Sequence, residues 1–448
     1  MGGVLSTSYI KNYSDINNME QTQTNIPLPF TGYQKLVIAI LALLQFTVVL
    51  DFMILAPLGD FLMKALTITP KGFGLVVSSY AFSAGASGIL AAGFADKFDR
   101  KKLLLFFYFG FIVGTLCCAL STSYEMLLGA RIVTGLFGGV IGAITLTIMT
   151  DLFAVNQRGS VMGFVQMAFS GSQILGIPIG LYLANAWGWH STFLMIVVLA
   201  FIIALVILFY IKPIDQHLAL QSDKNAFLHL WHAIMNPSYQ TGFLATAFLS
   251  VGGFMLMPFS SSYLINNIGI SSHQLPMVFM FTGISSIIIM PLIGKLSDKI
   301  DKFILFTGGC IIAVVMILIY TNMGVVPLWQ VIAINMVMFM GIMSRIIPAT
   351  ALNMSIPDMR DRGAFMSVNS SLQQMAGGLA ALFAGVIVTQ KTKTSPLEHY
   401  DILGLVVSVV IFISIFLIYR VNIMVKKKQA ILAAAEVADL DQAAALAH

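Results

Sequence analysis

Long uninterrupted stretches of apolar residues alternate with short polar stretches along almost the whole chain. A helix that crosses a hydrocarbon core of roughly 30 Å needs about 20 residues, and twelve of the apolar stretches reach that length. We expect membrane spans at 35–60, 72–94, 102–121, 125–151, 160–185, 191–211, 239–264, 273–296, 302–321, 327–350, 362–388 and 400–420. The pattern therefore predicts an all-α membrane protein with twelve transmembrane helices.

The predicted spans fall into two sets of six that repeat each other. The polar stretch at 93–102, GFADKFDRKK, returns in approximate form at 294–302 as GKLSDKIDK. A second pair of stretches keeps almost the same offset, since QRG at 157–159 matches DRG at 361–363. Repeats of this kind determine the architecture. We therefore expect two pseudo-symmetric six-helix bundles in the same orientation.

Stretches without long apolar runs divide the chain into parts. The first residues are polar and lack the basic and apolar regions of a signal peptide. One long polar loop separates the two sets of spans. We expect an N-terminal tail at 1–34, an N-terminal bundle at 35–211, a linker at 212–238, a C-terminal bundle at 239–420 and a C-terminal tail at 421–448.

Basic residues gather in the loops on one side of the predicted membrane. Only Lys64, Lys71, Lys391 and Lys393 fall in loops of the other side. Because loops rich in Lys and Arg stay in the cytoplasm, both termini and the central linker are expected there. A miscounted span would have mixed the two groups, so the segregation also supports twelve spans.

Composition narrows the class of protein. The chain is 58% hydrophobic and 10% charged, which excludes a soluble protein of this size. The net charge of +5 lies in the loops of one side and indicates topology, so we expect no nucleic-acid partner. Cys117, Cys118 and Cys310 lie inside apolar stretches and are interpreted as packing residues. No metalloprotease, Walker or serine-hydrolase motif occurs, so we expect no enzyme activity, catalytic residue, cofactor or metal site.

Asp51 is the only carboxylate well inside a predicted span. A carboxylate in a medium of low dielectric constant is costly unless it is paired or protonated, which makes Asp51 the leading candidate for a proton site. The alternative is a structural acid that stays hydrogen-bonded within the first bundle and never titrates.

Arg131 lies in the fourth span at a depth close to that of Asp51, within reach of its side chain. An ion pair between them would keep the carboxylate charged and would release it for protonation when a helix shift or a substrate separated the partners. Alternatively, Arg131 caps backbone carbonyls or pairs with another polar group.

Other polar residues inside the spans are candidates for a substrate cavity. Arg345 in the tenth span either binds substrate from the cytoplasmic side or extends to the membrane interface. Amides in membrane helices often bond only to neighbouring helices, although the repeat places Asn335 opposite Arg131. The full set of cavity candidates is Gln45, Tyr80, Gln166, Gln173, Tyr263, Asn335, Arg345, Asn369, Gln373 and Gln374.

Four motifs resemble those of the major facilitator superfamily. The stretches 93–102 and 294–302 resemble its loop signature between the second and third helices and the degenerate copy between the eighth and ninth. RIVTG at 131–135 resembles its arginine motif, which is associated with proton coupling. GSQILGIPIG at 171–180 resembles the glycine-proline motif of antiporters, with Ile177 in place of a glycine. DFMI at 51–54 resembles the first-helix signature of twelve-span drug:proton antiporters.

The resemblance also implies gating residues. The loop signatures contribute Gly93, Asp96, Arg100 and Asp298, and the antiporter motif contributes Gly171, Gly176, Pro178 and Gly180. Asp96 and Asp298 are expected to lie against the first turns of spans eleven and five, and to hold the cytoplasmic gate shut in the outward-facing state. Glycines permit close helix approach and proline bends a helix, so the second set is expected to shape the outer gate between the halves.

We expect a secondary active transporter that exports a small amphipathic molecule in exchange for protons by alternating access. With Asp51 ionised, Arg131 and Arg345 leave the membrane interior at about +1, which favours a neutral, zwitterionic or anionic substrate. A single carboxylate inside the membrane also favours one proton per cycle. The alternatives are a symporter or facilitator that imports a sugar or organic acid, and a non-transporting sensor. We expect a multi-pass protein of a bacterial inner membrane, with a monomer as the default.

Overall fold

The computed structural model describes residues 30–92, 97–215, 226–358 and 361–446, nearly all of them in helices. Within these residues, twelve helical segments are long and apolar enough to cross a membrane. This confirms the predicted fold class. The bounds of the spans agree with the apolar stretches, because backbone groups in hydrocarbon must be satisfied within their own helix.

The N-terminal half contains α2 (Gly32–Ile54), α3 (Gly59–Leu66), α4 (Pro70–Ala92), α5 (Arg100–Ala119), α6 (Tyr124–Leu152), α7 (Val155–Gly171), the π-helical turn η2 (Ser172–Gly176), α8 (Ile177–Trp187) and α9 (His190–Tyr210). The linker carries α10 (Ala226–Met235). The C-terminal half contains α11 (Pro237–Phe254), the 3₁₀ turn η4 (Met257–Phe259), α12 (Ser260–Asn266), α13 (Leu275–Lys299), α14 (Lys302–Thr321), α15 (Leu328–Asn353), α16 (Arg362–Ile387) and α17 (Tyr400–Leu446).

The repeated loop aspartates begin equivalent helices in the two halves. Asp99 accepts hydrogen bonds from the backbone N–H groups of Lys101 and Lys102 and caps α5. Asp301 does the same for α14 through two backbone N–H groups. A carboxylate at this position satisfies amide groups that have no partner inside the helix. One physical role of the repeated motif is therefore helix capping.

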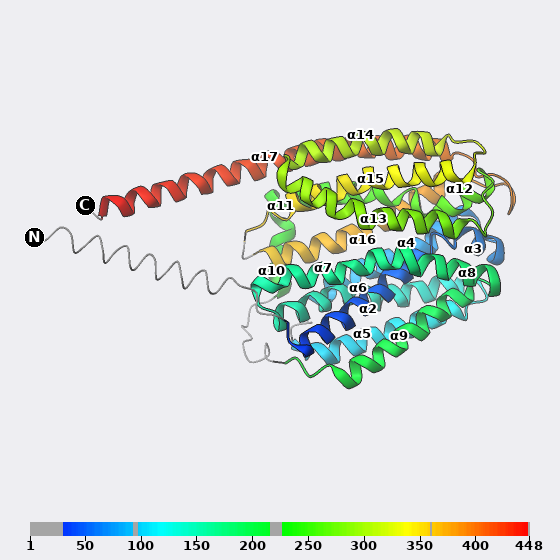
Figure 1. Cartoon of the computed structure of the whole chain (residues 1–448), viewed down its shortest axis with the longest axis horizontal. Coiled ribbons are helices and arrows are strands. Elements are labelled where there is room, and N and C mark those ends of the chain that lie inside the picture. The colour runs from blue at the N-terminus through cyan, green and yellow to red at the C-terminus, as the bar shows by residue number, and fades with distance from the viewer. Residues whose placement is uncertain (1–29, 93–96, 216–225, 359–360, 447–448) are drawn as a thin grey trace, which may run out of the picture.

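Figure 1 shows the two halves one above the other, with α4 and α16 where they meet. The start of α2 and the end of α17 lie at the same end of the bundle, which we call the termini side. The opposite end, which carries α3 and the turn after α8, is called the distal side. The last helix continues past residue 420, and Val421 and Val425 in this extension are buried against the C-terminal half.

The halves pack closely along α4 and α16 because small residues face each other. A Cβ atom built on Gly74 would lie 2.8 Å from the carbonyl oxygen of Ala381, and one on Gly385 would lie 2.9 Å from that of Pro70. The Ser78 hydroxyl donates a hydrogen bond of 2.8 Å to the carbonyl of Gly378. Small residues at such an interface allow backbones to approach in a membrane, where packing drives helix association.

A polar network joins the halves at the distal side. Lys64 forms an ion pair of 2.7 Å with Asp60, one turn away in α3. The Asn266 amide of α12 donates to the other oxygen of Asp60 at 2.7 Å and accepts a longer bond from Lys64 at 3.4 Å. Lys393 adds a bond to the Thr67 hydroxyl at 2.9 Å. Contacts of α3 with α12 and with the loop that contains Lys393 therefore close this side.

The first span of each half is broken at equivalent places. The turn between α2 and α3 contains Pro57, and the turn between α11 and α12 contains Pro258. Proline has no amide hydrogen with which to continue a helix. The Ser261 hydroxyl donates a bond of 2.8 Å to the Ala56 carbonyl in the first break. The two breaks therefore face each other across the interface.

On the termini side, several polar contacts between described loop residues lie within one half. Arg100 bonds to Asp151 at 3.1 Å, and Arg158 bonds to the Thr150 carbonyl at 2.7 Å. Lys426 pairs with Asp301 at 2.7 Å and holds the pKa of that carboxyl below its usual range. The described hydrogen bonds between halves lie at mid-depth or towards the distal side. These described bonds join the halves at mid-depth and at the distal side.

Gly74→Ala is expected to loosen the distal contact, because its methyl group has no room beside the Ala381 carbonyl. Overpacking of about 1–3 kcal/mol would raise the population of a distal-open state about fivefold or more. The measurement is the rate at which a membrane-impermeant maleimide, applied from the distal side, labels an added Ala56→Cys. Gly142→Ala is the control, since a Cβ there meets nothing within 4 Å. Equal labelling rates in the two variants would contradict the packing argument.

Asn266→Asp is expected to open the distal side, because it places a second carboxylate against Asp60. The exchanged pair Asp60→Asn with Asn266→Asp should restore closure, since Lys64 reaches both positions. The same labelling assay, compared with the parent chain, measures both effects. A double variant that labels as fast as Asn266→Asp would show that the network does not hold this side.

Candidate functional site

A buried ion pair lies inside the N-terminal half. The Arg131 guanidinium of α6 donates to the Asp51 carboxylate of α2 at 2.8 Å. The two side chains are 1% and 0% exposed. The contact expected from the similar depths of the two residues is therefore present.

Two further helices, α4 and α5, complete the surroundings of the pair. The Thr115 hydroxyl of α5 donates a weak bond of 3.4 Å to the other oxygen of Asp51. The guanidinium carbon of Arg131 lies 4.4 Å from the centre of the Tyr80 ring of α4, an arrangement that favours a cation–π interaction. Cys118, also on α5, is buried beside Thr134 of α6. Tyr80, a cavity candidate, thus belongs to the ion-pair site.

Glycines of α6 bring these helices together. A Cβ on Gly135 would lie 2.1 Å from the Ser83 hydroxyl and 2.4 Å from the Tyr80 carbonyl. A Cβ on Gly139 would lie 2.4 Å from the Ala84 carbonyl. Helix α6 therefore lies directly against α4, which holds the Tyr80 ring over Arg131. The glycines that follow the arginine in sequence explain how the site is packed.

The chemistry of the pair follows from its burial. Removing one partner of a buried ion pair leaves an uncompensated charge and costs about 3–5 kcal/mol. Protonation of Asp51 would remove the attraction that holds Arg131 and leave the Arg131 charge with the Tyr80 ring. Protonation would therefore give the site a second charge state with different contacts, and a conformational change requires such differential interactions.

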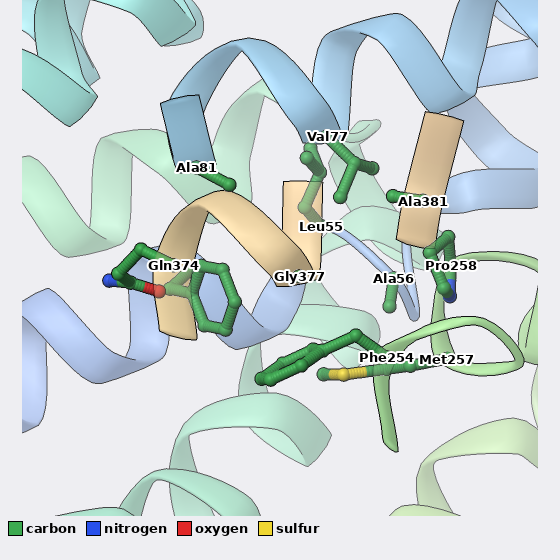
Figure 2. Close-up of a pocket in the computed structure, with 11 residues that line it drawn as sticks. Leu55, Ala56, Val77, Ala81, Phe254, Met257, Pro258, Gln374, Gly377 and Ala381 are labelled. Carbon is green, nitrogen blue, oxygen red and sulfur yellow. The ribbon is translucent and has the colours of Figure 1, made fainter. Parts of the chain in front are cut away.

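A pocket lies beside the pair, between the two halves. Figure 2 shows its lining, which comes from the two helix breaks and from α4 and α16. Phe52, the neighbour of Asp51 in α2, lines it and has its ring centre 5.6 Å from that of Tyr80 and 5.8 Å from that of Phe254. The lining residues are Phe52, Leu55, Ala56, Val77, Ala81, Phe254, Met257, Pro258, Gln374, Gly377 and Ala381.

The other cavity candidates are distributed over the molecule. Only Gln374 among them lines this pocket. Gln45 and Gln173 each have a buried side-chain oxygen without a hydrogen-bond partner, while Gln166 and Gln373 are exposed.

Three more candidates bond to protein groups. Asn369 accepts from the Thr246 hydroxyl at 2.6 Å, and Asn335 donates to a carbonyl of its own helix. Tyr263 lies in a distal aromatic cluster, where its ring stacks on Tyr400. These contacts are of the structural kind that amides and hydroxyls make in membrane helices.

Arg345 lies inside the C-terminal half and is 1% exposed. The side chain does not extend to an interface, because it is enclosed between α11, α14 and α17 near Gly252, Cys310 and Ile411. One of the two expectations for this residue, that it reaches the membrane surface, is therefore wrong. Packing of the other helices against α15 accounts for the difference.

The structure describes two of the four gating residues predicted from the loop motifs. Gly93 and Asp96 lie outside the described residues. Arg100 is buried and bonds to Asp151 within its own half, and Asp298 is exposed. In this structure the distal side is closed. The latch is predicted for the outward-facing state, so it stays a prediction.

The antiporter motif has glycines that pack against α2 and other residues that meet the C-terminal half. Cβ atoms built on Gly176 and Gly180 would lie 2.6 Å from Leu50 and 3.0 Å from Ile54, both on α2, so these glycines pack within the N-terminal half. The contact between halves uses Gly283 of α13 instead, whose Cβ would lie 2.8 Å from the Ile174 side chain.

Two other features of the motif are local. Gly171 has ordinary contact with Phe46, and Pro178 directly follows the π-helical turn η2 and begins α8. The prediction that these residues shape the outer gate between the halves stays a prediction. The residues that meet Gly283 of the other half, Gln173 and Ile174, come from the π-helical turn of the motif.

Sequence reasoning also missed the distal network around Asp60, since helix-end charges normally face water. Asp60 and Lys64 are four residues apart, which weakly indicates an ion pair on one helix. Asn266 is 206 residues from Asp60, and no sequence pattern indicates that the two side chains meet. Within the described residues, no group of three His, Cys, Asp or Glu side chains could hold a metal ion.

Comparison with known proteins agrees with this geometry. A family model described as Major Facilitator Superfamily matches residues 41–381 and, in a second match, 244–434. An uncharacterized MFS-type transporter of Bacillus subtilis, YbcL, is 25% identical over 388 residues, covering 85% of this chain and 95% of the relative. A probable sugar efflux transporter of Mannheimia succiniciproducens is 22% identical and covers 56% of this chain and 62% of the relative.

Solved structures show the same fold. A bacterial homologue of the human lysosomal transporter Spinster, in inward-facing and unoccupied conformation, superposes with a TM-score of 0.72 at 15% identity and covers 89% of this chain and 99% of the other. The nucleoside transporter NupG superposes with a TM-score of 0.70 at 14% identity and covers 86% and 99%. With the family model matching most of its length, this chain belongs to the Major Facilitator Superfamily.

Proposed function

We propose that this transporter exports a small amphipathic molecule in exchange for protons, with Asp51 and Arg131 as the coupling pair. The observation that carries the proposal is the fully buried ion pair beside the pocket between the halves. Ionisable groups inside a membrane protein are expensive and usually functional. The resemblance of 171–180 to the antiporter motif favours export.

The coupling would work through the contacts of α2. Asp51 and Phe52 are neighbours, so one helix carries both the carboxylate and a wall of the pocket. Protonation of Asp51 weakens its hold on Arg131, and the helix becomes free to change its position against Tyr80 and Phe254. Substrate that enters between Phe52 and Phe254 also acts on the contacts of α2 with Tyr80 and Phe254, from the side of the pocket. Proton and substrate thereby bias one conformational equilibrium.

The conformation described here fits the loading state of this cycle. The distal side is held by the Asp60 network and by close packing of α4 on α16. If the termini are cytoplasmic, as the distribution of basic loops predicts, the closed side is the outer one. The loop residues Gly93, Asp96, Arg100 and Asp298 would then form their latch only after the pocket has turned outward.

Asp51→Asn is expected to abolish substrate-driven proton movement, because an amide, unlike a carboxylate, does not gain and lose a proton near neutral pH. The measurement is a pH-sensitive dye inside proteoliposomes under an imposed pH gradient, with a panel of amphipathic compounds. The exposed Glu125→Gln on α6 is the control and should behave like wild type. Substrate flux without proton movement in the wild type would instead support a facilitator.

Asp51→Asn leaves Arg131 uncompensated and is expected to lower stability as well. The double variant Asp51→Asn with Arg131→Gln removes both charges and should regain most of that stability, while proton movement stays absent. Chromatographic behaviour and thermal unfolding in detergent separate folding from coupling. A double variant that still moves protons in response to substrate would overturn the role of the pair.

A further inference from the structure

The C-terminal half contains a buried arginine that has no counterion among the described residues. Arg345 is 1% exposed, and its Nε and Nη2 atoms have no hydrogen-bond partner. The polar side chain recorded beside it is the thiol of Cys310. A guanidinium stays charged in proteins, and a buried charge with unsatisfied donors is unfavourable.

The described carboxylates of this half lie at or beyond the helix ends. Asp301 pairs with Lys426, Asp358 with Lys428, and Glu398 with Lys391. Asp361 accepts from Tyr239 near the termini side, while Asp298 and Asp401 are exposed near helix ends. Within the described residues, the charge that balances Arg345 therefore does not come from the C-terminal half itself.

The internal repeat shows where a counterion would stand. The proline of the first break, Pro57, corresponds to Pro258 of the second break, and the same offset makes Gly252 the counterpart of Asp51. Arg345 is not the repeat counterpart of Arg131, since the repeat places Asn335 there, but both arginines belong to the fourth span of their halves and both reach the first span of that half. In one half this span offers a carboxylate, and in the other it offers a glycine.

Gly252 lies directly against one of the free donors. A Cβ built there would lie 3.3 Å from Nη2 of Arg345 and 3.5 Å from Ile411 and Val410 side-chain carbons. A Cβ on the following Gly253 would meet nothing within 4 Å. The paired donors of a guanidinium match the two oxygens of a carboxylate and also accept a single halide.

We propose that Arg345 is the binding site for one small monovalent anion, held against Gly252 within the C-terminal half. The anion takes the place that the Asp51 carboxylate occupies beside Arg131. It is either a halide from solution or the carboxylate of an organic molecule. The proposal does not depend on proton coupling, because it concerns a different half and an equilibrium binding event.

The test is the thermal unfolding midpoint of the full chain, purified in detergent in HEPES buffer and titrated with sodium chloride, sodium benzoate or neutral benzamide. A ligand that binds only the folded state raises this midpoint in a saturable manner, here by about 2–4 °C. Benzoate is expected to produce the rise and benzamide is not. A rise with chloride as well would identify a general anion site, whereas a rise with benzoate alone would identify a carboxylate site.

Two variants connect the response to the site. Arg345→Gln should lose the saturable rise, and its remaining shift measures the general salt effect. Gly252→Asp provides a built-in carboxylate, so it should unfold at a higher temperature than wild type without added anion and should no longer respond. Gly252→Ala is the steric control and should keep the response, since the flexible end of Arg345 can yield to a methyl group.

The proposal is overturned if wild type and Arg345→Gln respond equally to both salts, if benzamide acts like benzoate, or if Gly252→Asp keeps the full response. Should Arg345→Gln fail to fold, the comparison of Gly252→Asp with Gly252→Ala decides the question by itself. Loss of proton coupling in a separate transport assay would leave this result unchanged.

Discussion

The cost of charge in a membrane interior is the constraint on which the central site depends. Asp51 and Arg131 are tolerated at full burial because each neutralises the other at 2.8 Å. The helices around them are arranged for that contact, since Gly135 and Gly139 let α6 lie directly on α4 and bring the Tyr80 ring to the guanidinium. Any event that changes the charge of Asp51 must therefore change the packing of four helices.

The helix breaks connect the site around Asp51 to the interface between the halves. Helix α2 carries Asp51 and ends three residues later, at Ile54, before the turn that faces the equivalent turn of α11. The pocket, the Phe52–Phe254 contact and the Ser261–Ala56 hydrogen bond all lie where the two breaks meet. Irregular backbone is acceptable at membrane depth only when it is buried in protein or lines a cavity, and the breaks of this protein do both.

The halves share a backbone plan but have different charge chemistry. Each has a broken first span, an aspartate cap on the third span and an arginine on the fourth. Only the N-terminal half pairs its arginine with a carboxylate, because Gly252 stands where Asp51 stands in the repeat. This difference separates a proton-sensitive half from a half whose arginine is available to an anion, on the proposals made above.

The sequence by itself determined the class of fold, the number of spans and the internal repeat, because hydrophobic length and the positions of charge are local properties that a bilayer enforces on each helix separately. It also predicted that Asp51 and Arg131 would meet, since depth in the membrane follows from counting residues. Only the tertiary structure decided which faces touch: that Gly176 packs on α2, that Gly283 faces the other half, that Asn266 reaches Asp60, and that Arg345 is enclosed. Rotation and tilt of a membrane helix depend on its neighbours, and no local pattern in an almost uniformly apolar span records them.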